Sequence, residues 1–167
     1  MPHAREIIEG GSSGGGQRTQ QRRMGPTTGG PQGMDITQMF ALAVGLAYLA
    51  IGIVGFAATG FTGITSDGRD ALLGFDLNVF HNVVHLAIGA GFLAVSRLSD
   101  PTITQGVVIG GGAVYVLAGL LGFLNDLQIL SIDSALAADN FLHLFSGLAA
   151  VTFGIIGARR SDALRTA

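Results

Sequence analysis

The sequence predicts an all-α membrane protein, with four transmembrane helices built from two parallel helical-hairpin repeats and preceded by a disordered tail. Three observations support this class: only 12% of the residues are charged, four long apolar blocks follow residue 35, and residues of the first two blocks recur in the last two. Soluble domains carry about 25% charged residues. The predicted spans are 39–61, 77–95, 106–124 and 135–158, each long enough to cross a hydrocarbon core about 30 Å thick.

The first 34 residues differ in composition from the rest. Residues 1–34 are rich in Gly, Gln and Arg and hold too few apolar side chains to form a core, so they are expected to be a disordered cytoplasmic tail. They contain no apolar region typical of a secretory signal peptide. The membrane domain is expected at 35–160, followed by a short cytoplasmic tail at 161–167.

Each apolar block is expected to be a helix, because lipid offers no hydrogen-bond partner to an open backbone. The connections are short and hold turn residues. Glycines and three Asp residues lie between the first two blocks, Ser-Asp-Pro follows the second block, and the last connection, 125–134, is acidic.

The positions of the Arg residues predict the orientation. Eight of the nine fall on one side when the chain crosses the membrane four times, and only Arg69 falls on the other. By the positive-inside rule, both termini are expected in the cytoplasm.

The first and third blocks share five residues at a constant offset of 67. The pairs are Gly45 and Gly112, Tyr48 and Tyr115, Gly52 and Gly119, Gly55 and Gly122, and Phe56 and Phe123. The second and fourth blocks share four more at an offset of 58. These are Asn82 and Asn140, His85 and His143, Leu86 and Leu144, and Gly89 and Gly147. Two spans per copy give both copies the same orientation, so the repeat predicts a pseudo-two-fold axis along the membrane normal.

The repeated glycines are expected to pack helices together. Helices in lipid associate through close van der Waals contact, which small residues permit. Their spacing places them on one stripe of each helix, and no strand or Lys accompanies them as in a phosphate loop. The expected packing positions are Gly45, Gly52, Gly55, Gly112, Gly119 and Gly122.

The polar residues of the two copies are expected to form one layer near the middle of the bilayer. They are Tyr48, Asn82, His85, Tyr115, Asn140 and His143. A polar side chain at that depth needs a partner. Interhelical hydrogen bonds would give this layer a purely structural role.

A metal site is an alternative use of the same layer. His81 and His85 are spaced i, i+4 on one helix face, and their repeat equivalents are Asp139 and His143. Three imidazoles and one carboxylate are a suitable tetrahedral shell for zinc. His85 and His143, at matched depth on different helices, would also suit bis-His haem ligation.

Composition excludes several other functions. The chain has no Cys, so disulfides, thiol catalysis, iron–sulfur clusters and Cys-ligated zinc are excluded. The net charge is −2 without a dense basic stripe, so nucleic acid is not an expected partner. No nucleophile elbow or ordered triad is visible, and no catalytic residue is assigned.

Two runs of the sequence resemble a known family. Residues 78–86, Asn-Val-Phe-His-Asn-Val-Val-His-Leu, are followed by Gly89; residues 138–144, Ala-Asp-Asn-Phe-Leu-His-Leu, are followed by Gly147. They resemble the signatures of an uncharacterised four-pass membrane family, a domain of unknown function common in actinobacteria. The resemblance covers roughly 38–160. It implies a four-pass inner-membrane protein with both termini inside and implies no activity.

The first functional expectation is therefore a small structural or accessory helical bundle of unassigned activity. A metal- or haem-binding membrane protein is the alternative, and a small transporter or proton-relay component is a second one, because intramembrane His can relay protons. The lipid bilayer is the expected environment. Glycines on lipid-facing surfaces, such as Gly110 and Gly111, would permit a homo-oligomer or a membrane-complex partner.

Overall fold

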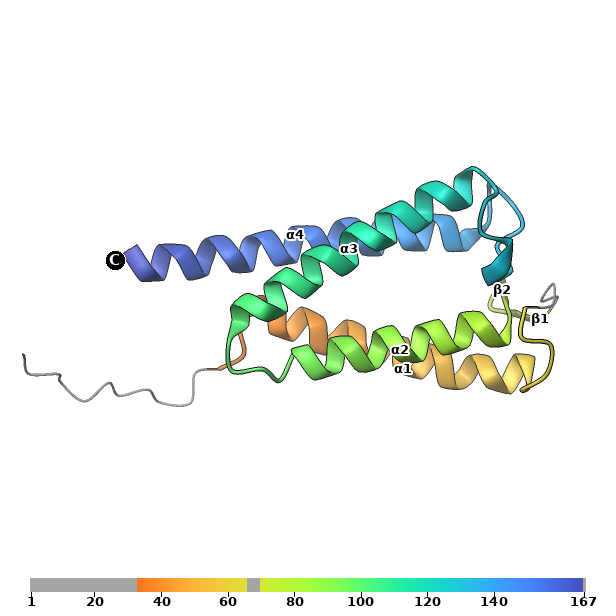
Figure 1. Cartoon of the computed structure of the whole chain (residues 1–167), viewed down its shortest axis with the longest axis horizontal. Helices are drawn as coiled ribbons and strands as arrows, with labels where there is room; N and C mark the ends of the chain where they lie inside the picture. Colours follow the sequence, from red (N-terminus) through yellow and green to blue (C-terminus); the bar gives the residue numbers. More distant parts are fainter. Residues whose placement is uncertain (1–32, 66–69, 167) are drawn as a thin grey trace, which may run out of the picture. The chain divides into compact units, whose positions relative to one another are not determined.

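The computed structural model describes residues 33–65 and 70–166, which belong to one compact unit. The expected tail at 1–34 lies outside the described residues except for its last two positions, and so does Arg69. Four helices follow one another up and down, with one short β-hairpin (Figure 1). The elements are α1 (Ile36–Thr59), β1 (Asp70–Leu72), β2 (Phe75–Leu77), α2 (Val79–Val95), α3 (Pro101–Phe123), the 3₁₀ helix η1 (Gln128–Leu130) and α4 (Ala138–Thr166).

The all-α prediction is confirmed, and three of the helices are long and apolar enough to cross a membrane. These are α1, α3 and α4, with 24, 23 and 29 residues. The apolar helix α2 has 17 residues and is about 25 Å long at 1.5 Å per residue. Helix α4 continues to Thr166, so most of the segment expected as a tail at 161–167 is helical.

The starts of three helices follow from their capping residues. Asp35 accepts a hydrogen bond from the backbone N–H of Gln38, whose side chain bonds back to Asp35 in a capping box. Asn78 caps α2 and Asp100 caps α3, where Pro101 takes the first helical position. Hydrogen bonds from Thr102 lower the pKa of the exposed Asp100 carboxyl.

Within each hairpin, glycines bring two helix backbones into direct contact. A methyl group on Gly45 would meet the backbone nitrogen of Leu93 at 2.8 Å, and one on Gly89 would meet that of Leu49 at 2.7 Å. Helices α3 and α4 pack in the same way around Gly112. These glycines therefore allow the close approach of the two helices in each pair.

The second hairpin shows two further glycine contacts. Gly119 lies against the backbone of Asn140 and Leu144, and Gly147 lies against the backbone nitrogen of Val116 at 2.7 Å from its ideal Cβ position. Gly111, expected on a lipid-facing surface, lies instead against the ring of Phe92, because α2 and α3 meet there. Gly110 has nothing within 4 Å and does fit that expectation.

The β-hairpin between α1 and α2 was not predicted. Strands β1 and β2 pair antiparallel, with Leu72 opposite Phe75. Leu73 and Gly74, at φ 56° and 89°, form the two-residue turn, and such turns require positive φ at both positions. Gly74 adopts such a φ readily, but Leu rarely does, which is why no local pattern indicated a hairpin.

At the opposite end, an Ile-Thr-Gln triplet at 36–38 recurs at 103–105 and joins the hairpins. The hydroxyl of Thr37 donates to the carbonyl of Phe153 on α4 at 3.2 Å, and that of Thr104 donates to the carbonyl of Val95 on α2 at 2.6 Å. The offsets of 67 and 58 relate these two bonds to each other. The triplet lies at the edges of the expected apolar blocks, so the repeat within those blocks does not include it.

Candidate functional site

Three histidines converge near the β-hairpin end of the helices. His81 and His85 lie in the first two turns of α2, and His143 lies in the second turn of α4. One ring nitrogen from each lies within 4.8 Å of the others. The ring centroids of His81 and His85 are 4.4 Å apart, and those of His81 and His143 are 6.2 Å apart. All three side chains are buried, with 5% exposure or less. We call this group the histidine cluster.

Several ring nitrogens of the histidine cluster lack hydrogen-bond partners among the described residues. Nδ1 of His85 and Nδ1 of His143 are buried with no hydrogen-bond partner among the described residues. Both ring nitrogens of His81 lack a hydrogen bond of good geometry, although the backbone of Asp76 and Leu130 is close. Buried polar atoms in proteins are nearly always paired. The cluster is therefore incomplete as a hydrogen-bonded core.

Asn78 positions His81 and ties it to the second hairpin. Its side-chain oxygen accepts from the backbone N–H of His81 at 2.8 Å, and its amide donates to the carbonyl of Ile129 in η1 at 3.0 Å. The start of α2 and the loop before α4 are thereby held together. The place of Asn78 directly before an apolar helix is the sequence signal for its capping role, whereas nothing in the sequence indicates its bond to Ile129.

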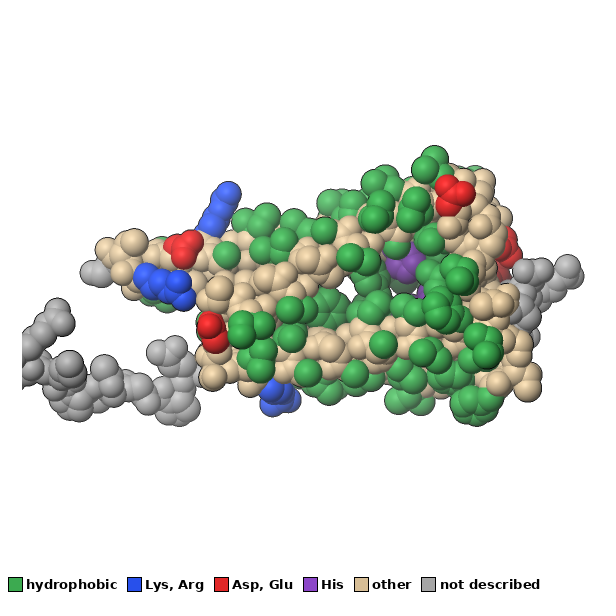
Figure 2. Space-filling view, in the orientation of Figure 1, with side chains coloured by type: hydrophobic (Ala, Val, Ile, Leu, Met, Phe, Trp, Pro, Cys, Tyr) green, Lys and Arg blue, Asp and Glu red, His purple; other side chains and the backbone are tan. Residues whose placement is uncertain are grey.

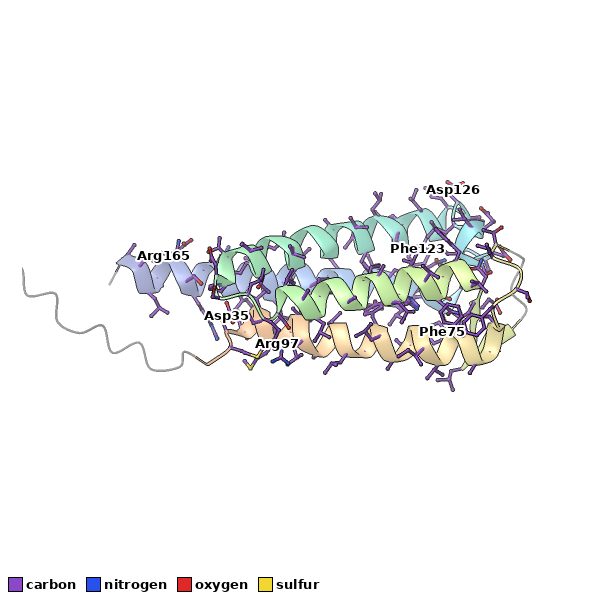
Figure 3. The ribbon with its side chains drawn as sticks, turned by 60° about the horizontal axis from the view of Figure 1, so that its bottom comes forward. Asp35, Phe75, Arg97, Phe123, Asp126 and Arg165 are labelled. Atoms are coloured by element: carbon purple, nitrogen blue, oxygen red, sulfur yellow. The ribbon has the colours of Figure 1, made fainter. Side chains whose placement is uncertain are left out.

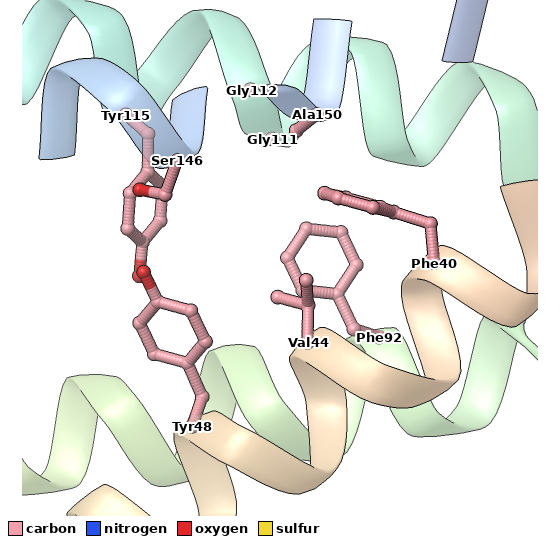
Figure 4. A pocket seen from close by; sticks show the side chains of 9 residues that line it. All are labelled: Phe40, Val44, Tyr48, Phe92, Gly111, Gly112, Tyr115, Ser146 and Ala150. Atoms are coloured by element: carbon pink, nitrogen blue, oxygen red, sulfur yellow. The ribbon is translucent and has the colours of Figure 1, made fainter. Parts of the chain in front are cut away.

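The two Tyr residues of the expected polar layer do meet the histidines. The rings of Tyr48 and His85 are 5.2 Å apart, and those of Tyr115 and His143 are 5.3 Å apart, both edge-on. Tyr48 and Tyr115 contact each other at 5.4 Å between centroids. Their hydroxyls meet beside Ser146, on the wall of a small apolar pocket between the hairpins (Figure 4).

The two Asn residues of the expected layer lie apart from this group. The amide of Asn82 donates to the hydroxyl of Thr59 at 2.9 Å, and its oxygen lies against Gly55. Asn140 makes the corresponding contact with Gly122. Each Asn thus binds within its own hairpin, and an added Cβ at the facing glycine would collide with the Asn oxygen.

Asp139, expected as a fourth metal ligand, is not part of the histidine cluster. It lies in the first turn of α4, is 4% exposed, and lines a cavity of about 140 Å³ together with Tyr48 and His85. Leu77 and Phe75 of the β-hairpin form part of the cavity wall. The structure therefore brings together three of the four expected ligands and leaves the carboxylate beside them.

The surroundings of the site are largely apolar. Apolar side chains cover the helices around an opening in which a histidine is visible (Figure 2). Arg97 and Arg165 lie at the far end with Asp35, whereas Phe75 and Phe123 lie at the end that carries the site (Figure 3).

These features define the class of protein: a bundle of long apolar helices, compatible with a membrane protein, that contains a buried polar site. Comparison with family models identifies the particular family: the chain belongs to the family described as a domain of unknown function, DUF4383, which matches residues 38–156. No curated protein and no solved structure matches the chain.

Proposed function

We propose that this protein is a four-pass membrane protein that binds one divalent transition-metal ion, zinc in the first place, in its histidine cluster. The observation that carries the proposal is the convergence of three buried imidazoles, of whose six ring nitrogens four have no hydrogen-bond partner among the described residues. Neutral imidazole is a preferred ligand of zinc and its neighbours in the first transition row.

The geometry is close to that of a loaded site. Zinc–nitrogen bonds of about 2.1 Å place tetrahedral ligands about 3.4 Å apart. The present spread of 4.8 Å requires only small side-chain rotations of His81, His85 and His143. Three of the four histidines in the chain lie in this one cluster, so the ion would use every histidine of the membrane domain.

A single ion fits the cluster better than haem does. A haem needs a flat slot between two axial ligands, wide enough for the macrocycle. The rings of His81 and His85 are 4.4 Å apart and Tyr48 packs edge-on against His85, which fills that space with protein.

The four-pass architecture rests on two supports beyond helix length. Helix α2 is paired along its length with α1 and continues from the β-hairpin, so it lies at the same depth as its longer partner (Figure 1). The bonds of Thr37 and Thr104, related by the repeat offsets, favour two hairpin copies around a pseudo-two-fold axis.

We further propose that the arginine-bearing end faces the cytoplasm of the inner membrane and the histidine cluster lies in the outer half. The chain has no Cys, so single cysteines can report this orientation. In intact cells, an impermeant maleimide should label Leu73→Cys in the β-hairpin and not Arg165→Cys. The reverse labelling would overturn the orientation.

Metal analysis of the full chain, purified in mild detergent without a polyhistidine tag, tests the metal site. About one zinc per chain is expected for the wild type and for His3→Ala, the matched control outside the cluster. His85→Ala and His143→Ala should lose the ion. A folded wild type that binds no added zinc, or an unchanged stoichiometry in both cluster variants, would overturn the proposal.

A structural bundle is the second candidate, because glycine and Asn contacts hold each hairpin together without using the histidines. Under this alternative, His81→Ala would leave metal content and stability unchanged. A metal-binding protein should instead show a chelator-sensitive melting temperature in the wild type that His81→Ala removes, since an ion that binds only the folded state stabilises it.

A further inference from the structure

The two hairpins place different residues at one matched position beside the site. His81 and Asp139 are related by the repeat offset of 58, and each lies one helical turn before the paired histidines His85 and His143. In a pseudo-two-fold arrangement, these two residues therefore flank the His85–His143 pair from opposite sides.

The His81 side of the pair is filled with protein. The ring of His81 contacts that of His85, and the backbone of Asp76 and Leu130 is close. A third imidazole occupies the space on this side.

The Asp139 side of the pair holds the cavity. It measures about 140 Å³ and is lined by His85, Tyr48 and Asp139, with apolar walls otherwise. A water molecule occupies about 30 Å³ of liquid and needs polar partners to be held in such a space. The carboxylate of Asp139 and an ion held by His85 would be such partners, because both residues line this cavity.

We propose that the metal centre is of the open kind: three imidazoles hold the ion, and its fourth position faces this cavity and carries an exchangeable water that donates a hydrogen bond to Asp139. This inference rests on the proposed function. Three protein ligands plus one water is the arrangement that leaves zinc reactive, whereas closed sites use four protein ligands. Asp139 acts as a positioning residue, because its carboxylate accepts the hydrogen bond that orients the water.

The cavity also sets which molecules can reach the ion. Its walls, including Leu77, Phe75 and Leu142, favour small and weakly hydrated ligands over large polar ones. The carboxylate of Asp139 disfavours anions, so water is the resting ligand. A small linear anion such as azide should still compete for the position at high concentration.

Cobalt(II) loaded into the full chain gives a spectroscopic test, because its visible absorption reports the coordination number and the ligands. Azide titration of the wild type should change that spectrum in a saturable way. Asp139→Asn should keep the cobalt and bind azide at least tenfold more tightly, because the repelling charge is gone. Asp126→Asn, an exposed carboxylate at the same end of the molecule, is the control and should match the wild type.

The outcomes separate this inference from the function on which it rests. If cobalt does not bind and His85→Ala behaves as the wild type, the metal site itself is absent. If cobalt binds through the histidine cluster but azide leaves the spectrum unchanged, the site is closed and this inference is wrong. Equal azide affinities in the wild type and Asp139→Asn would remove the role of Asp139. If Asp139→Asn does not fold, the wild-type titration alone decides whether the position is open.

Discussion

The two hairpins pack alike and differ in chemistry. In both, glycines bring the helix backbones together and one Asn lies against a glycine of the partner helix: Asn82 against Gly55, and Asn140 against Gly122. The difference falls where the site lies, with His81 in the first hairpin and Asp139 in the second. The loops differ as well, since a β-hairpin precedes α2 and η1 precedes α4.

This comparison separates what a helix pair needs from what the site needs. Substitution of the contact glycines is unfavourable in both copies, because a Cβ at these positions would meet backbone atoms. His81 and Asp139 are not among these glycine contacts, so the residue at this matched position can differ between the two copies. The first hairpin therefore contributes one more imidazole to the site, and the second contributes Asp139 and the cavity beside it. The two sides of the site differ in chemistry although the hairpins pack alike.

The largest expected effect comes from exchanging the chemistry of the matched positions. His81→Asp removes the third imidazole and should weaken zinc binding at least 100-fold, about 2.7 kcal/mol. Asp139→His adds a fourth imidazole, so it should bind zinc at least as tightly as the wild type and no longer respond to azide. Competition with a chromophoric chelator measures both affinities.

The double exchange, His81→Asp with Asp139→His, is the control for this pair. If the scaffold is symmetric around the site, it should recover most of the wild-type affinity, because three imidazoles are again present. An affinity as low as that of His81→Asp alone would show that the two sides are not interchangeable.

Periodicity predicted the helices that the structure shows, because it records position along a helix. The repeat spacing led to the hypotheses of packing glycines and of a polar layer with Tyr48, Tyr115, His85 and His143. For the metal hypothesis, the structure groups His81, His85 and His143 and leaves Asp139 outside that group. Spacing on one helix shows that Asp139 and His143 share a face, but it cannot show how far a short carboxylate lies from side chains of the other hairpin.

Contacts between the hairpins were harder to predict. The bond of Thr37 joins α1 to α4, the first and last helices of the chain, and that of Thr104 joins the start of α3 to the end of α2. The link from Asn78 to Ile129 depends on how a loop folds. The β-hairpin turn at Leu73 runs against local preference. Tertiary packing decides such features, and no local pattern encodes them.

The glycine contacts can be tested with matched pairs on one helix. Gly89→Ala should lower the free energy of unfolding by about 1–3 kcal/mol, because its Cβ would lie 2.7 Å from the backbone nitrogen of Leu49. Gly91→Ala, with nothing within 4 Å, should be neutral or slightly stabilising. Unfolding by dodecyl sulfate in mixed micelles, followed by circular dichroism, measures both.

The second hairpin provides the same comparison with Gly147→Ala and Gly110→Ala. Similar losses for Gly89→Ala and Gly147→Ala would support equal packing in the two copies. If the free energy of unfolding falls for only one of these two variants, the two hairpins do not pack alike, and close glycine packing is important only in that helix pair.

The two Asn residues should differ in a predictable way. Asn140 donates to the backbone carbonyls of Ser134 and Ala135 and so holds the loop before α4. Asn140→Ala should cost about 1–2 kcal/mol of unfolding free energy. Asn82→Ala should cost less, because its partner, the Thr59 hydroxyl, already bonds the carbonyl of Gly55. Equal losses would contradict this account.

The smallest expected effects are at the bonds that join the hairpins. Thr37→Val and Thr104→Val keep the side-chain shape and remove one donor each, so each should cost about 0.5–1.5 kcal/mol of unfolding free energy. Thr152→Val is the control, because that hydroxyl bonds its own helix at Leu148 and is exposed.

The two losses should be equal within error if the repeat relates them, and they should add in the double variant, because the bonds share no partner. Their effect on zinc affinity separates the ends of the molecule. The histidine cluster takes its residues from both hairpins. Loss of a hydrogen bond between the hairpins at the far end should therefore weaken zinc binding slightly, by less than tenfold, without changing the stoichiometry. A large loss of zinc in Thr37→Val would mean that the junction, and not the cluster alone, fixes the distance between α2 and α4.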